Sequence, residues 1–300
     1  MAKGFSRIVI MGNPSDAAAL ESVAAVTGYL AGKVAEVSVS AKLPPPSGAA
    51  EHAACDDAEL PDGADLVIAV GGDGTVLYAA RLASTHQVPV LGINRGRLGF
   101  LADVLPEDIQ TSIEAVLTGN YTRETRMMLN AEVFSNGKPA GTGLALNDVV
   151  IKRRETARML EYRTFVNDSY VNTHGGDGVI AATPTGSTAY ALSCGGPIIQ
   201  PGMDAIVLAP ICPHTLSDRP IVIPGSSSTE IELTENHGND ADVSGDGELI
   251  GTMGTGDRLR ISVSADRVEL LHPPGYDYYG VLRSKLYWGR DTRDRQPPSD

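Results

Sequence analysis

Apolar and polar residues repeat with helical and strand-like spacings that alternate along the first 125 residues. Largely apolar runs at 7–11, 34–39, 64–70 and 88–93 predict buried strands, as in a parallel sheet covered by helices. Between them, apolar residues recur every three or four positions, which predicts helices beginning near residue 15, at 75–84 and at 106–117. This alternation predicts an open, doubly wound α/β domain over residues 1–125.

The pattern changes after residue 126, where short apolar runs and period-two alternation replace the helical spacing. The expected strands are 127–134, 144–152, 160–167, 205–211, 220–223, 229–233, 259–263 and 268–271. Turn residues separate them, which is typical of a mostly β, sandwich-like domain, here expected over 126–271. Residues 272–300 are expected to be helical in part over 276–288 and to end in a disordered polar tail. The Pro- and Ala-rich segment 43–63 is expected to be a surface loop without chemistry.

Composition narrows the possible partners. The net charge is −13 and no basic stripe is visible, so nucleic acid is not an expected partner. No apolar run approaches the roughly 18 residues needed to span a bilayer, and the first residues lack a signal-peptide pattern. Three widely spaced cysteines fit neither a disulfide framework nor a zinc site. We therefore expect a cytoplasmic protein with no membrane partner.

The loop Gly71-Gly72-Asp73-Gly74-Thr75 lies between an expected strand and an expected helix. Each glycine costs about 0.5–1 kcal/mol relative to alanine. In return, such a loop lets a ligand approach the backbone and points N–H groups at phosphate. A carboxylate there repels phosphate unless it has its own task, such as holding or deprotonating a sugar hydroxyl. Alone, the pattern also fits a tight connection with no ligand.

Two further stretches combine glycines with polar side chains. The stretch 183–190, Thr-Pro-Thr-Gly-Ser-Thr-Ala-Tyr, precedes an expected short helix that Ser187 or Thr188 could cap. Its N–H groups could receive a polar ligand, and Tyr190 could stack on a base. A capping turn with incidental hydroxyls explains this stretch equally well, and a β-turn explains Gly175-Gly176-Asp177-Gly178 better than a site does.

Several stretches in order resemble one family, the NAD kinases of the bacterial type. They are 71–75, 94–101 (Asn-Arg-Gly-Arg-Leu-Gly-Phe-Leu), 146–148 (Leu-Asn-Asp), 177–198 and 213–220. The resemblance runs from about residue 65 to 288. It implies phosphoryl transfer from ATP or polyphosphate to the 2′-hydroxyl of the adenosine ribose of NAD, giving NADP. It also implies a homodimer or homotetramer, and a C-terminal segment that packs back on the first domain.

The resemblance also implies residue roles. Asp73 is the expected catalytic base, and Gly71, Gly72, Gly74 and Thr75 the cradle for the donor phosphates. Mg²⁺ or another divalent cation is expected with the donor, although the sequence indicates no protein ligands for it. The implied NAD-binding residues are Asp73, Gly74, Asn147, Asp148, Arg158, Gly175, Asp177, Thr185, Thr188, Ala189, Tyr190, Ser193, Asp246 and Glu248.

Two of these positions bear on specificity. Asp148 stands where the family usually has Glu, so its bond to a ribose hydroxyl needs a water molecule or a backbone shift. Gly175 stands where some relatives carry arginine, and glycine there is associated with accepting NADH as well as NAD. Asp177 is expected to hold the nicotinamide carboxamide, because a carboxylate accepts from an amide NH₂.

Two other functions share part of this pattern. A lipid kinase of the diacylglycerol or sphingosine type has a similar glycine-aspartate loop, but the 183–190 stretch and the absence of a membrane-binding segment argue against it. A non-catalytic dinucleotide-binding regulator would keep the 183–190 stretch but would not need Asp73.

Overall fold

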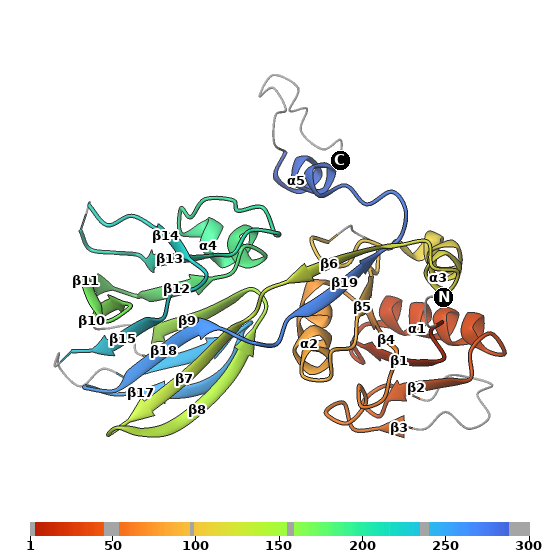
Figure 1. Cartoon of the computed structure of the whole chain (residues 1–300), viewed down its shortest axis with the longest axis horizontal. Coiled ribbons are helices and arrows are strands. Elements are labelled where there is room, and N and C mark those ends of the chain that lie inside the picture. Colours follow the sequence, from red (N-terminus) through yellow and green to blue (C-terminus); the bar gives the residue numbers. More distant parts are fainter. Residues whose placement is uncertain are drawn as a thin grey trace. The chain divides into compact units, whose positions relative to one another are not determined.

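The computed structural model describes residues 4–44, 54–96, 99–154, 159–215, 217–234 and 240–287. The chain divides into two compact units (Figure 1). The first contains Met1–Leu82, Val88–Arg123 and Leu270–Asp300, and the second contains Ala83–Gln87 and Glu124–Glu269. The candidate residue Arg158 and the expected disordered tail lie outside the described residues.

The first unit is built on a seven-stranded sheet with the order β3-β2-β1-β4-β5-β19-β6. The strand order reverses at β1, which pairs in parallel with β2 on one side and β4 on the other. In such sheets, ligands bind beyond the carboxyl ends of the strands near this reversal. The bounds are β1 Arg7–Gly12, β2 Glu36–Ser40, β3 Ala54–Cys55, β4 Leu66–Val70, β5 Val90–Ile93, β6 Thr122–Arg126 and β19 Val268–His272.

Helices cover both faces of this sheet, which confirms the expected doubly wound α/β fold. The helices α1 (Ala17–Leu30) and α3 (Ile109–Leu117, after the 3₁₀ turn η1 Pro106–Asp108) share one core with alternate residues of β1, β4 and β5. The helix α2 (Asp73–Ser84) packs on the other face, because a Cβ built on Gly92 would lie 3.1 Å from Val76 Cγ2.

Two expectations for this unit are wrong. Residues 268–271, expected as the last strand of the β domain, belong to β19, which pairs in parallel with β5 in the first sheet. The described part of the expected surface loop 43–63 contains β3 and a buried carboxylate, Asp57. Asp57 receives hydrogen bonds from Tyr78 (2.9 Å) and Ser40 and pairs with Lys42 (2.8 Å), which compensates its burial.

The second unit is a sandwich of two six-stranded sheets, as expected for a mostly β domain. The sheet orders are β11-β10-β15-β18-β7-β8 and β14-β13-β12-β9-β16-β17. Inward-facing residues of both sheets form one core. Alternate positions are buried in β7, β15 and β16, whereas β12 and β13 are buried along their whole length. The bounds are β7 Leu129–Ser135, β8 Lys138–Ala145, β9 Asp148–Arg153, β10 Leu160–Val166, β11 Ser169–Gly176, β12 Gly178–Ala182, β13 Ala205–Ile211, β14 Ile221–Pro224, β15 Thr229–Leu233, β16 Ala241–Gly245, β17 Glu248–Met253 and β18 Arg258–Val263.

The single strand expected at 144–152 is wrong. The chain leaves one sheet after Ala145 and enters the other at Asp148, so Leu146 and Asn147 form a corner between β8 and β9. Apolar residues lie directly on both sides of the corner, at 144–146 and 149–151, so the two polar residues between them did not by themselves indicate a break. The strands β11, β12, β16 and β17 were not expected from the sequence either.

The C-terminal segment returns to the first unit, as the resemblance implied. It contains α5 (Tyr278–Leu286), which is capped by the Asp277 side chain accepting from the Tyr279 N–H at 3.0 Å. None of the helices among the described residues combines the length and apolar character needed to cross a membrane.

Candidate active site

The Gly71–Thr75 loop connects the carboxyl end of β4 to α2, so it lies beside the reversal point of the first sheet. Gly71 leaves no room for a side chain, because its Cβ would overlap the Thr75 side chain. Gly72 and Gly74 are different: a Cβ on either would meet no atom within 4 Å. The loop is therefore closed on one side and open on the other, where a ligand can approach its backbone.

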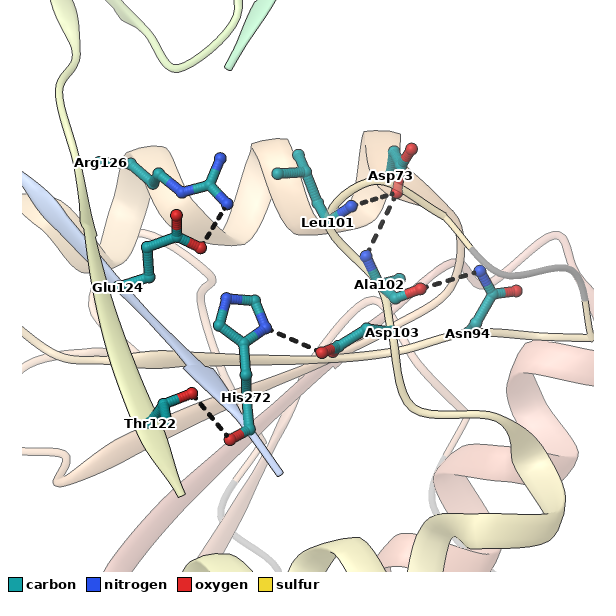
Figure 2. Close-up of polar contacts among 9 residues, drawn as sticks. All are labelled: Asp73, Asn94, Leu101, Ala102, Asp103, Thr122, Glu124, Arg126 and His272. Atoms are coloured by element: carbon teal, nitrogen blue, oxygen red, sulfur yellow. Dashed lines mark hydrogen bonds and ion pairs between the residues drawn. The ribbon is translucent and has the colours of Figure 1, made fainter. Parts of the chain in front are cut away.

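The Asp73 carboxylate is held by three backbone N–H groups of the loop that follows β5. Phe100 donates to Oδ2 at 3.0 Å, and Leu101 and Ala102 donate to Oδ1 at 3.0 and 3.2 Å. Figure 2 shows the Leu101 and Ala102 bonds. Because a carboxylate oxygen has two acceptor positions, Oδ2 keeps one that no described residue occupies. The carboxylate is thus fixed in orientation and still able to accept a proton.

The same loop is held to the sheet by Asn94. Its Nδ2 donates to the Ala102 carbonyl at 3.2 Å (Figure 2). Its backbone N–H donates to the Val104 carbonyl at 2.7 Å. Gly99 lies so close to Asp73 that a Cβ there would overlap Oδ1. The described residues of the 94–101 stretch therefore help to orient Asp73, a role that the sequence motif alone did not indicate.

In the second unit, a carboxylate again organises a loop. Asp246, at the β16–β17 turn with φ of 49°, accepts from the N–H groups of Leu146 (2.9 Å), Asn147 (2.8 Å) and Asp148 (3.3 Å). Thr183 closes the corner from the other side: its N–H donates to the Asn147 carbonyl at 2.9 Å and its Oγ1 to the Leu146 carbonyl. Three predicted site residues are therefore joined directly: Asn147, Asp148 and Asp246.

Asp148 is 6% exposed, and its pKa is raised to about 7 by burial and then by the Asp246 charge. It lines a cavity of about 480 Å³ together with Tyr190, Lys152 and Ser244. Tyr190 is 37% exposed there, and its partial burial raises its pKa. A cavity with an aromatic ring, a cation and a carboxyl group suits a polar ligand that carries a flat ring.

The 183–190 stretch folds as a 3₁₀ turn, η2 (Gly186–Thr188), before the short helix α4 (Tyr190–Ser193). The expected capping by Ser187 or Thr188 is wrong. Ser187 Oγ instead donates to the Pro184 carbonyl (2.6 Å) and accepts from the Ile199 N–H (2.9 Å), while Thr188 Oγ1 donates to the Thr185 carbonyl. Buried residues shape the stretch, and Thr188, Ala189 and Tyr190 are left partly or fully exposed along it.

The remaining predicted residues are placed as follows. Asp177 lies between β11 and β12 and pairs with Arg153 at 2.9 Å. A Cβ on Gly175 would lie 2.9 Å from the Met159 side chain, so a larger residue there requires Met159 to move. Ser193 ends α4 and is exposed, as is Glu248 at the start of β17.

Sequence reasoning missed Arg126, which is 2% exposed and is the largest fully buried side chain. Its guanidinium donates to Thr185 Oγ1 at 3.1 Å. It also pairs with Glu124 at 2.7 Å, as Figure 2 shows. The available signal was the spacing: residues i and i+2 of a strand share a face, so Glu124 and Arg126 form a charge pair beside an apolar run.

A larger cavity, about 560 Å³, lies in the first unit and is lined by none of the predicted site residues. Asp103 lines it and pairs with buried His272 at 2.8 Å (Figure 2), whose ring stacks on Tyr276. No group of three or more His, Cys, Asp or Glu residues in the described part of the chain could hold a metal ion. The described residues therefore offer no protein cage for a divalent cation.

Comparison with known proteins shows that two family models match the sequence of this chain. The model of the ATP-NAD kinase N-terminal domain matches residues 8–121, and that of the ATP-NAD kinase C-terminal domain matches residues 146–272. The NAD kinase of Nitrosococcus oceani is 42% identical over 97% of this chain and 99% of its own length. The NAD kinase of Photobacterium profundum is 40% identical over 96% of this chain and 98% of its own length.

Two solved structures resemble this one. The crystal structure of yeast NADH kinase complexed with NADH has a TM-score of 0.89, covers 98% of this chain and 91% of its own, and is 23% identical, so it bears on the fold alone. The crystal structure of an NAD kinase from Archaeoglobus fulgidus in complex with ATP has a TM-score of 0.71 at 25% identity, covering 94% of this chain and 98% of its own.

Proposed function

Because the chain belongs to the NAD kinase family, we propose that it transfers the terminal phosphoryl group of ATP or polyphosphate to the 2′-hydroxyl of the adenosine ribose of NAD. In this reaction the 2′-oxygen bonds to the terminal phosphorus while the bond to the bridging oxygen breaks, giving NADP and the shortened donor. The observation that carries the proposal is the Asp73 carboxylate, which three backbone N–H groups orient and which keeps one acceptor position.

Asp73 acts as the base in this proposal. A secondary alcohol must lose its proton as it attacks, and a positioned carboxylate contributes roughly 10²–10⁴-fold to such a step. The proton goes to the open position of Oδ2 and then to solvent. The bonds from Phe100, Leu101 and Ala102 keep the carboxylate in place during the transfer.

The donor phosphates are assigned to Gly71, Gly72, Gly74 and Thr75. The open space at Gly72 and Gly74 supports this assignment, as does the start of α2 at Asp73, because the N-terminal end of a helix attracts phosphate. Mg²⁺ would be held mainly by donor oxygens and water, as is usual for this ion with phosphate substrates. When bound, it neutralises the charge of the transferred group.

NAD is assigned to the second-unit residues that the family resemblance implies, with Thr185, Thr188, Ala189 and Tyr190 at the adenine end. Asn147 and Asp148 suit ribose hydroxyls, and the cavity beside Tyr190 suits the adenine end. Asp177 suits the nicotinamide carboxamide, although its pairing with Arg153 means that the amide competes for a carboxylate already in use. Gly175 supports use of NADH as well as NAD, because no cation stands there to select one redox state.

The cellular compartment and the oligomeric state of the enzyme are proposed from other observations. Cys194 and Cys212 are free thiols, which supports a reducing, cytoplasmic compartment. Ile221 and Val222 are exposed on β14, an edge strand of its sheet, which supports association into a homodimer or homotetramer. Light scattering on the purified protein measures the oligomer directly, and a monomer at micromolar concentration would contradict that part.

One experiment tests the function. Purified protein is incubated with NAD and ATP·Mg²⁺, and NADP is measured, with polyphosphate and NADH as parallel donor and acceptor arms. We expect NADP from the wild type, and from Asp73→Asn a rate lower by several orders of magnitude with NAD binding largely kept. An undiminished Asp73→Asn variant would falsify the base assignment. Phosphorylation of diacylglycerol or sphingosine, or binding of NAD without turnover, would instead favour the lipid-kinase or regulator alternatives.

A further inference from the structure

Arg126 is a buried cation for which the proposed reaction has no direct use. At 2% exposure, it has lost the hydration that a charged side chain normally keeps, and such a loss is compensated only by close, well-oriented partners. Its partners include Glu124 Oε2 at 2.7 Å and Thr185 Oγ1 at 3.1 Å. Glu124 supplies the opposite charge, and Thr185 links the pair to the 183–190 stretch.

The chemistry of the guanidinium determines which partner donates in this hydrogen bond. A guanidinium can only donate hydrogen bonds, so Thr185 Oγ1 must be the acceptor. The hydroxyl keeps its own hydrogen, and none of the hydrogen bonds among the described residues uses it. Thr188 Oγ1, by contrast, donates to the Thr185 carbonyl and does not compete for the Thr185 hydroxyl.

We infer that Arg126 is a positioning residue of the dinucleotide site, which holds the Thr185 hydroxyl as a hydrogen-bond donor toward an acceptor atom of the bound adenine. This inference rests on the proposed function, in which Thr185 lies at the adenine end of NAD. Adenine ring nitrogens are acceptors, so they match a hydroxyl that keeps its own hydrogen while Arg126 fills one of its two acceptor positions. The ion pair with Glu124 keeps the guanidinium in this orientation.

The inference makes NAD affinity, and not the chemical step, depend on Arg126. For Arg126→Met, which keeps the apolar stem and removes the donor, we expect the KM for NAD to rise roughly tenfold or more, in line with loss of a hydrogen bond to a charged group. The KM for ATP should stay within about twofold. Arg123→Met is the matched control, because Arg123 lies on the same strand but is exposed, and it should leave both constants unchanged.

Thr185 provides the second arm. Thr185→Val keeps the shape and removes the hydroxyl, and should raise the KM for NAD as much as Arg126→Met does. Thr185→Ser keeps the hydroxyl and should restore most of the affinity. Since both single changes remove the same interaction, the double variant Arg126→Met, Thr185→Val should be no worse than either one.

The outcomes separate this inference from the proposed function. If the wild type forms no NADP, the proposed function fails, whatever the variants do. If the wild type is active and Arg126→Met lowers only the melting temperature and the active fraction, leaving the KM for NAD unchanged, Arg126 is merely structural and the inference is wrong. Should Arg126→Met not fold, Glu124→Gln and the Thr185 pair decide: equal KM values for Thr185→Val and Thr185→Ser overturn the inference.

Discussion

Among the described residues, backbone groups alone hold the carboxylate of Asp73 in the first unit, whereas buried or half-buried side chains hold the 146–148 corner and the 183–190 stretch of the second unit. Three N–H groups bind Asp73, and glycine at 99 makes room for them. Asp246, Thr183 and Arg126 do the corresponding work in the second unit. A region held by backbone depends on the conformation of a loop, and a region held by side chains depends on single functional groups.

This difference predicts different responses to mutation. In the first region, adding a methyl group at a glycine should displace the carboxylate and reduce the chemical step. In the second region, changing one side-chain atom should weaken substrate binding while leaving turnover near its original value. Steady-state constants separate these two responses.

The largest effect is expected for Gly99→Ala. The new Cβ would overlap Asp73 Oδ1, so the carboxylate or the 99–102 loop must move. A displacement of about 1 Å at a reacting group costs on the order of 10²-fold in rate. We expect kcat to fall by about that factor with NAD affinity kept. Gly28→Ala, where a Cβ meets nothing within 4 Å, is the control. A normal kcat for Gly99→Ala would contradict the view that the conformation of the 99–102 loop determines the position of the Asp73 carboxylate.

A smaller effect is expected for Asp246→Asn. The amide nitrogen replaces one acceptor oxygen, so a backbone N–H of the 146–148 corner loses its partner, at about 1–3 kcal/mol. Asn tolerates the left-handed φ of this position, so the backbone itself is not perturbed. We expect the KM for NAD to rise roughly tenfold, measured at saturating ATP.

The control for Asp246→Asn is Asp168→Asn. Asp168 also has a left-handed backbone, with φ of 62°, and is exposed in the β10–β11 turn. It should behave as the wild type. A drop in kcat with unchanged KM for NAD in Asp246→Asn would mean that the corner orients the reacting groups and not only the substrate.

The smallest effect on turnover is expected for Asp148→Asn, which keeps an acceptor oxygen. Its main expected effect is on how the free energy of unfolding depends on pH. Because the pKa of Asp148 is about 7 in the folded state and about 4 when unfolded, the folded state binds the proton more tightly. Its contribution to the free energy of unfolding is therefore complete below pH 4 and is lost as pH rises toward 7 and beyond.

Denaturant unfolding at several pH values tests this sign. In the wild type, the free energy of unfolding contributed by Asp148 should fall by up to about 1.4 kcal/mol per pH unit between about pH 4 and pH 7. Since other carboxylates titrate too, the informative quantity is the difference between the two proteins. Asp148→Asn should gain stability over the wild type as pH rises from 4 to 8. A difference that does not change with pH would show that Asp148 is not the titrating group.

The sequence predicted those parts of the fold in which burial determines the pattern. Residues 66–70 and 205–211 are buried throughout, so they appear as continuous apolar runs. The strand β11 was missed because most of its residues are exposed or half-buried and its sequence, Ser-Tyr-Val-Asn-Thr-His-Gly-Gly, is mixed. The corner at 146–147 was missed for a different reason, since strongly apolar residues lie directly on both sides of Asn147 and Asp148.

The candidate site was predictable only as a set of motifs. The residues of the loops at 71–75 and 183–190 are visible in the sequence, but their partners are distant in the chain. Nothing near Asp73 indicates that residues 100–102 will bind its carboxylate, and Arg126 meets Thr185 across 59 positions. Residues that position others carry no local signature, because their partners are determined by the fold.

The position of β6 beside β19 has a consequence for how the chain could have been assembled. The chain leaves the first sheet through β6 and re-enters it through β19, and these strands are hydrogen-bonded neighbours. Residues 127–267 therefore form an insertion whose two ends are carried by neighbouring strands, with the start of β6 close to the end of β19, since Thr122 Oγ1 donates to the His272 carbonyl at 3.5 Å. Any domain whose own termini lie close together could be exchanged for this one without breaking a strand pair of the host sheet.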